Sequence, residues 1–181
     1  MKENRNEIVF AGLLAVLAIA TRLVFNYLHV FNFNAVMATA FFAGATLSRK
    51  KLAMLIPLGA MLLTDMYLGF YDWRIMATVY GAFALVIFIG SHYAEKPSLL
   101  SFVVSLLGGS MSFFLLTNFA VWLFGDGMLY AHTTAGLVQC FAMGIPFYRN
   151  TLLGDITFST ALFGGLALYR YRVSTVQRVI A

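Results

Sequence analysis

Apolar residues gather into five long stretches and one short stretch, with brief polar connections between them. Each long stretch has about the 20 residues that a helix needs to cross the hydrocarbon core of a bilayer. The pattern predicts an all-α membrane protein, a single domain that forms a bundle of about six transmembrane helices. The long stretches cover residues 8–28, 52–70, 75–93, 99–124 and 151–169, the short one covers residues 35–47, and the domain covers residues 1–181.

The region before the last span is harder to divide. Residues 135–169 are apolar, which is too long for one span, and Pro146 and the pair Arg149-Asn150 interrupt them. Apolar helices of 10–14 residues rarely cross a membrane. We therefore expect an extra short helix at 134–145, lying on the membrane or dipping into it, followed by the sixth span.

Composition supports the membrane assignment. Charged residues make up 10% of the chain, against roughly 25% in an ordinary soluble domain. Hydrophobic residues reach 61%, and the mean hydropathy is +0.85. So few charges could not cover the surface of a water-soluble fold. The first apolar stretch is too long for a cleaved signal peptide, so we expect it to remain as the first span.

Lys and Arg are distributed unevenly between the two ends of the predicted spans. With six spans both termini lie on one side, which holds nine basic residues, whereas the other side holds two. Because basic residues collect in cytoplasmic loops, we predict cytoplasmic termini and a multi-pass protein of the cell (inner) membrane. The nine are Lys2, Arg5, Arg49, Lys50, Lys51, Lys96, Arg170, Arg172 and Arg178, and the two are Arg74 and Arg149.

Four polar residues in different spans lie at a similar depth. Counting from the outer helix ends at 1.5 Å per residue places them roughly 6–9 Å beneath the outer surface. Ionisable groups within a span are costly and usually face the bundle interior. One interpretation is a structural ion pair, and the other is the floor of a pocket that opens outwards. The four residues are Arg22, Asp65, Asn118 and Asp155.

The outer loops and helix ends above this layer are rich in aromatic, amide and charged residues. Such groups suit a small, planar, polar ligand. Tyr, Trp and His are also common membrane-interface anchors, so each could be an anchor instead. With the deeper layer, the candidate substrate-binding residues are Asn32, Asn34, Asp72, Trp73, Arg74, Trp122, Tyr130, His132, Phe147, Arg149 and Asn150.

Recognised chemical motifs are missing from the sequence. No HExxH, GxSxG, Walker or Rossmann pattern occurs, and the three histidines are scattered. Cys140, the single cysteine, is more typical of packing than of metal binding. Basic residues lie at helix ends and form no patch interleaved with exposed aromatics, which argues against a nucleic-acid partner. We therefore expect no enzyme, no metal and no cofactor, with the bilayer and a small molecule as partners.

Small residues recur in the first span, where Ala11 and Ala15 form a small-xxx-small pair. Such pairs let helix backbones approach closely in lipid. Internal packing is the commoner use of this pattern. A surface that couples to another membrane subunit is the alternative.

The layout resembles the S components of energy-coupling factor transporters. The local signatures also resemble an uncharacterised family of small bacterial membrane proteins related to them. The resemblance implies a subunit that captures a vitamin-like molecule from outside, under the loops at 29–34, 71–74 and 125–150. It also implies a membrane coupling subunit with two cytoplasmic ATPases, contacted through Ala11 and Ala15. The signatures are Asn32-Phe33-Asn34, residues 57–65 with Leu68-Gly69-Phe70, FFLLTNFAVW at 113–122, and residues 145–155.

Two other classes of protein stay open. The polar layer would permit a self-sufficient small transporter or channel, although the inner halves of the spans carry no polar stripe such as ion paths normally show. A membrane-embedded enzyme or assembly factor could use Asp65, Asp155 and His132 as an acid–base set. Their spacing matches no known catalytic signature.

Overall fold

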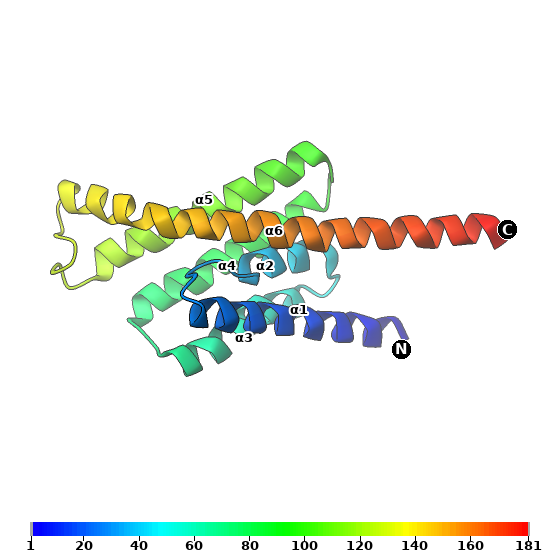
Figure 1. Cartoon of the computed structure of the whole chain (residues 1–181), viewed down its shortest axis with the longest axis horizontal. Coiled ribbons are helices and arrows are strands. Elements are labelled where there is room, and N and C mark those ends of the chain that lie inside the picture. Colours follow the sequence, from blue (N-terminus) through cyan, green and yellow to red (C-terminus); the bar gives the residue numbers. More distant parts are fainter. Residues whose placement is uncertain (1, 181) are drawn as a thin grey trace.

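The computed structural model describes residues 2–180, and the side chains of residues 7–175 (Figure 1). Within this part of the chain there are six helices and no strand, which confirms the predicted all-α class. The basic residues Lys2, Arg5 and Arg178 lie outside the described side chains. The helices are α1 (Lys2–Tyr27), α2 (Val36–Thr46), α3 (Lys50–Leu68), α4 (Trp73–Tyr93), α5 (Leu99–Phe124) and α6 (Thr134–Ile180).

Five of the described helices, all except α2, are long and apolar enough to cross a membrane. Their outward faces carry large apolar side chains, including Leu13 at 63% exposure and Phe88 at 69%. Soluble proteins rarely expose extended apolar surface of this kind. A lipid environment accounts for it.

Both termini lie at the same end of the bundle, as an even number of passages requires (Figure 1). We call this the terminal end and the other the opposite end. The chain still makes six passages because the segment before α2 runs inward from the opposite end as irregular backbone (Figure 1). The short α2, of 11 residues and so about 16 Å long, completes that passage.

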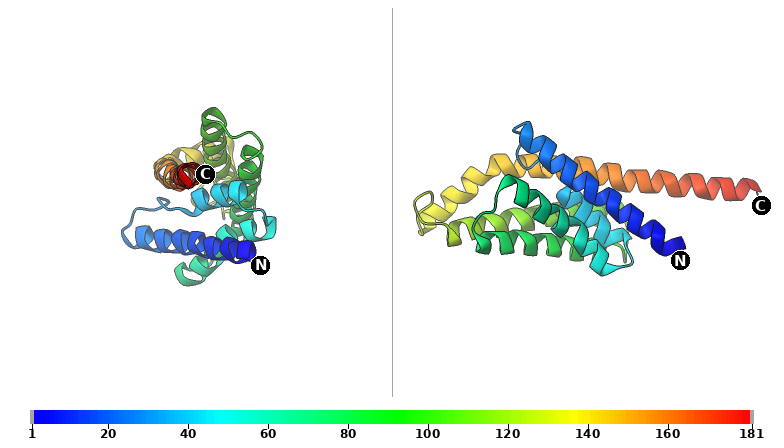
Figure 2. Two further views of the ribbon diagram at one scale, coloured as in Figure 1. Left: turned by 90° about the vertical axis from the view of Figure 1, so that its right-hand side faces the viewer. Right: turned by 90° about the horizontal axis from the view of Figure 1, so that it is seen from below.

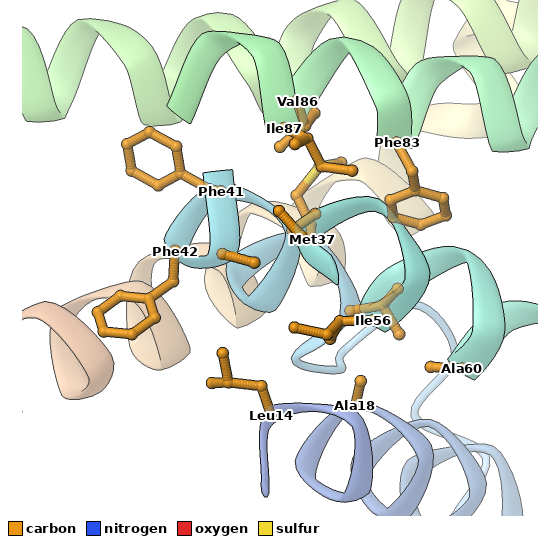
Figure 3. Packing of buried hydrophobic residues seen from close by; sticks show 14 of the residues in the cluster. Leu14, Ala18, Met37, Phe41, Phe42, Ile56, Ala60, Phe83, Val86 and Ile87 are labelled. Carbon is orange, nitrogen blue, oxygen red and sulfur yellow. The ribbon is translucent and has the colours of Figure 1, made fainter. Parts of the chain in front are cut away.

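Helix α2 forms the centre of the bundle. Every residue from 36 to 44 is buried, and α2 contacts α1, α3, α4 and α6. Figure 3 shows Leu14 and Ala18 of α1 on one side of α2, and Val86 and Ile87 of α4 on the other. A helix so surrounded needs no polar face, which explains its uniformly apolar and small-residue sequence.

Two glycines bring the backbones of α2 and α4 together. A Cβ atom at Gly44 would collide with the carbonyl oxygen of Ile87, and one at Gly90 would collide with the carbonyl oxygen of Phe41. Lys50 Nζ and Ser91 Oγ also bond to the Gly44 carbonyl oxygen, at 3.2 and 3.1 Å. The two helices are therefore fixed to each other at backbone distance.

The expected separate helix at 134–145 is wrong, because α6 is continuous from Thr134 to Ile180 with Pro146 inside it. Proline removes one N–H and its ring crowds the carbonyl of Ala142, which bends a helix without having to end it. In lipid, ending α6 here would leave several more backbone groups without partners. The helix bends instead, between its yellow and orange parts in Figure 2.

The small-residue pair of α1 packs against the core of the bundle, as the commoner use of this pattern predicts, and its role in coupling to another subunit stays a prediction. Ala11 is only 3% exposed and shares a face with Leu14 and Ala18, while Ala15 is half-buried against the same core. This face packs against α2 and α3. The pair therefore contributes to close packing of α1 against the core.

We predict that Gly44→Ala and Gly90→Ala each destabilise the bundle, because the added methyl group meets backbone that cannot move aside. Overpacking of this kind costs about 1–3 kcal/mol, which corresponds to a fall of about 5 °C in unfolding temperature. Thermal unfolding in mild detergent measures the effect. Gly81→Ala is the matched control, since no atom lies within 4 Å of a Cβ there. Equal stability of all three variants would contradict the backbone contact.

Candidate functional site

A cavity of about 240 Å3 lies in the opposite half of the bundle, beyond the first turn of α2. It exists because α2 begins only at Val36, so the volume that a full-length helix would fill is left to a loop and to open space. All six helices contribute to its lining. The lining residues are Arg22, Asn32, Asn34, Val36, Met37, Met61, Tyr71, Val79, Phe83, Phe113, Thr117, Thr151 and Asp155.

A second cavity of about 190 Å3 adjoins the first between α5 and α6. The two share Asn32, Phe113, Thr117 and Thr151 as lining residues. The second is the more aromatic of the two, and the rings of Phe114 and Tyr148 lie 4.7 Å apart in it. The site thus has a polar compartment and an aromatic one. The further lining residues of the second cavity are Phe114, Asn118, Val121, Gly144, Phe147 and Tyr148.

Arg22, which lines the first cavity, forms an ion pair with Asp65, which does not. Nη2 of Arg22 lies 2.6 Å from Oδ1 of Asp65, and Nη1 donates to Thr64 Oγ1 and to the Met61 carbonyl oxygen. The Tyr80 hydroxyl donates to the other Asp65 oxygen at 3.0 Å. Both carboxylate oxygens therefore have partners, which a fully buried carboxylate requires.

Asp155 is also buried, at 1% exposure, but its surroundings differ. Ser110 of α5 donates to Oδ2, and no ion pair within the described residues includes Asp155. The carboxylate lines the first cavity. The predicted layer of Arg22, Asp65, Asn118 and Asp155 therefore holds one carboxylate with a cationic partner and one, in the cavity lining, with only a serine.

Two asparagines from the loop between α1 and α2 line the first cavity. Asn34 accepts the Val36 N–H at Oδ1, 3.0 Å away, and so begins α2. Asn32 lines both cavities and has a positive φ of 65°, a conformation that asparagine tolerates better than most residues. Both side chains are thus placed by the backbone geometry of the loop.

The loop is anchored to α1 and α6. The Ala35 N–H donates to Thr21 Oγ1 at 3.0 Å, and Asn150 Nδ2 donates to the Phe31 carbonyl oxygen at 3.0 Å. Gly154 packs against the backbone of Asn34, where a Cβ would come within 3.1 Å of its N and O atoms. The Asn150 side chain therefore fixes the loop between α1 and α2 to α6. Gly154, which contacts this loop, directly precedes Asp155 in the sequence.

Tyr71, in the connection between α3 and α4, lines the first cavity. Burial, followed by the nearby charge of Asp65, raises the pKa of its phenol to about 12. The phenol is therefore neutral at any physiological pH. It can both donate and accept a hydrogen bond inside the cavity.

Asp72 and Arg74, two of the predicted site residues, instead join the start of α4 to the end of α5. Asp72 caps α4 by accepting the Arg74 N–H at 2.8 Å, and it pairs with the Arg74 guanidinium, also at 2.8 Å. The hydrogen bond from Arg74 is the main reason that the pKa of Asp72 is lowered to about 2. The guanidinium lies 5.1 Å from the ring centre of Phe124.

Trp122 and His132 close the connection between α5 and α6. Trp122 Nε1 donates to the Ala131 carbonyl oxygen at 2.9 Å, and His132 Nε2 lies 3.1 Å from the Gly125 carbonyl oxygen. The rings of Trp122 and His132 lie 6.0 Å apart, so the two residues stabilise the conformation of this loop. Neither residue lines either cavity. Trp73, at 74% exposure, points outwards as an interface anchor would.

The structure brings together part of the predicted site. Among the predicted residues, the two cavities are lined by Arg22, Asn32, Asn34, Asn118, Phe147 and Asp155. Asp65 and Asn150 do not line a cavity themselves. Asp65 binds the lining residue Arg22, and Asn150 binds the loop that carries Asn32 and Asn34. The residues that line neither cavity and support neither are Asp72, Trp73, Arg74, Trp122, Tyr130, His132 and Arg149.

Sequence reasoning missed Tyr71, Thr117 and Thr151, which all line the first cavity. Helical spacing could have found one of them, since Thr151 lies one turn before Asp155 on the same face. Cys140 is 1% exposed, and its Sγ contacts the Asn118 carbonyl oxygen at 3.3 Å. Among the described residues no three of His, Cys, Asp and Glu come together as metal ligands would.

Comparison with known proteins identifies a family but no function. The model of a family of unknown function, DUF6580, matches residues 2–177. Neither the curated proteins nor the solved structures include a match to this chain. What the site does has to be inferred from its own geometry.

We predict that Asp65→Ala destabilises the protein by about 3–5 kcal/mol, because it leaves the Arg22 guanidinium without its partner. The double variant Arg22→Met/Asp65→Leu should recover most of this loss, since apolar residues often replace a buried ion pair at little cost. Thermal unfolding of the single and double variants in detergent measures both. Asp126→Ala, in the loop after α5, is the control. A double variant less stable than Asp65→Ala would contradict the pairing.

Proposed function

We propose that this chain, which belongs to the DUF6580 family of unknown function, is a membrane protein that binds a small polar molecule for uptake. The observation that carries the proposal is a cavity with polar and aromatic lining whose inner end is closed by packed apolar side chains. A cleft with convergent polar groups on a largely apolar wall is the usual form of a small-molecule site.

The closed inner end of the cavity supports binding in preference to conduction. Val36 and Met37 line the cavity, and the next turn of α2 presents Phe41 and Phe42. The rings of Phe41, Phe102 and Phe163 pack with centres 5.1 to 5.9 Å apart. An ion path normally has polar groups along its length, and the core directly beyond the cavity is instead built from packed apolar side chains.

The distribution of basic residues supports an outward-facing cavity. At the terminal end the described side chains include Arg49, Lys50, Lys51, Lys96, Arg170 and Arg172. Under the positive-inside rule that end is cytoplasmic. The opposite end, where the cavity lies, would then face the outside of a cell (inner) membrane.

Uptake also needs a source of energy. The sequence contains no ATPase motif. The resemblance to S components, which rests on the helix layout, supports a separate membrane coupling subunit with two cytoplasmic ATPases. Since Ala11 is buried, such a subunit would contact the exposed face of α1 that carries Leu13 and Val16.

We predict that Thr117→Phe blocks ligand retention, because the larger side chain enters the space that the two cavities share. A steric cost of about 1–3 kcal/mol corresponds to a loss of about tenfold or more in occupancy. Native mass spectrometry of gently purified protein measures the retained small molecule. Leu116→Phe, whose side chain is 41% exposed on the neighbouring face of α5, is the matched control and should retain it.

Two outcomes would contradict the proposal. One is wild-type protein that retains no small molecule and whose unfolding temperature responds to no candidate ligand. The other is ligand-independent ion flux through the purified protein in liposomes, which would indicate a channel.

A further inference from the structure

Among the described side chains, Asp155 is the only acidic one that lines either cavity. It is 1% exposed, so its carboxylate is almost completely removed from bulk water. A buried carboxylate is strongly disfavoured unless it is protonated or has a cationic partner and hydrogen bonds. The identity of its partner therefore matters for both stability and function.

The described residues do not supply a cationic partner. Ser110, a neutral donor, bonds to Oδ2, and no described side chain bonds to Oδ1. Arg22 lines the same cavity, but its Nη atoms bond to Asp65, Thr64 and the Met61 carbonyl oxygen. The guanidinium is thus neutralised by Asp65. Oδ1 of Asp155 is therefore left without a bond to a described side chain, on a residue that lines the cavity.

The same face of α6 carries a second buried polar group that lacks a hydrogen bond to a described residue. Ser159, one turn further along, is 0% exposed, and its hydroxyl oxygen has no hydrogen-bond partner among the described residues. Polar groups kept in a core at a cost to stability are typical of functional sites. Asp65 shows that this bundle can satisfy a buried carboxylate fully where the role is structural.

We infer that the molecule bound in this cavity carries a protonated amine or amidine nitrogen, which pairs with Asp155. The inference rests on the proposed function and specifies its substrate class. The ammonium or amidinium group would occupy the polar compartment and donate to Oδ1. The adjoining compartment, with Phe113, Phe114 and Tyr148, accepts a compact apolar or aromatic body. Cavities of about 240 and 190 Å3 suit a molecule of one or two rings.

The test compares cationic probes with neutral molecules of the same shape. Benzylamine is paired with benzyl alcohol, and benzamidine with benzamide, in thermal unfolding of the full chain in mild detergent. We expect the cationic member of at least one pair to raise the unfolding temperature by at least about 2 °C, and the neutral members to have no effect. Asp155→Asn should abolish the response, whereas Asp126→Asn, in the exposed loop after α5, should retain it.

The unliganded variant provides a second measurement. If Asp155 serves ligand binding, Asp155→Asn without probe unfolds at the same temperature as wild type or higher, because it removes an uncompensated buried charge. A variant that does not fold, or that unfolds well below wild type, would show a structural carboxylate and overturn the inference. So would equal responses to cationic and neutral probes, or a cationic response that survives in Asp155→Asn.

Failure of this inference is distinguishable from failure of the proposed function. One distinguishing outcome in mass spectrometry is a retained molecule that has no basic nitrogen and is lost in Thr117→Phe. That result would overturn the inference and leave the binding function standing. No retained molecule and no response to any probe would overturn both.

Discussion

Backbone contact between α2 and α4 is the constraint from which the rest of the arrangement follows. At Gly44 and Gly90 no side chain separates the two helices, so α2 is held deep in the terminal half of the bundle. It is too short to fill the opposite half as well. The volume left over is occupied by the loop between α1 and α2 and by the cavities. Helix α2 therefore closes one end of the cavity, and because it is short it also leaves the volume that the cavity occupies.

The two buried carboxylates show how neighbours decide the role of a residue. Asp65 and Asp155 lie at similar depths in the sequence-based count, and both are almost fully buried. Asp65 has a guanidinium and a phenol on its two oxygens, and it stabilises the packing of α1 against α3. Asp155 has a single serine and an open cavity. Their burial is alike, and only the set of partners separates a structural acid from a candidate binding acid.

Much of the fold could be predicted because lipid imposes simple rules on helix length and charge. The spans, the short second helix and the shared side of the termini all follow from those rules. The break expected at Pro146 did not occur, since a local proline effect is weaker than the need to keep backbone hydrogen bonds in an apolar medium.

The site was harder to predict than the fold. Depth counting found Arg22, Asn118 and Asp155, because a buried polar group in a span is rare enough to stand out. It could not separate cavity residues from loop-closing ones such as Trp122 and His132, which bond to backbone carbonyls. Thr117 and Thr151 gave little signal, because a threonine in a span can satisfy its hydroxyl on its own helix, as both do here.

The continuity of α6 has a mechanical consequence. The same helix carries Asp155 in the cavity wall and Arg170 and Arg172 at the terminal end, with no break between them. From Asp155 to Thr175 it acts as a lever of about 30 Å. Pivoting such a rod by about 5° at the cavity displaces its far end by about 2–3 Å. A displacement at Asp155 would thus reach the terminal end of the bundle without any helix changing its internal structure.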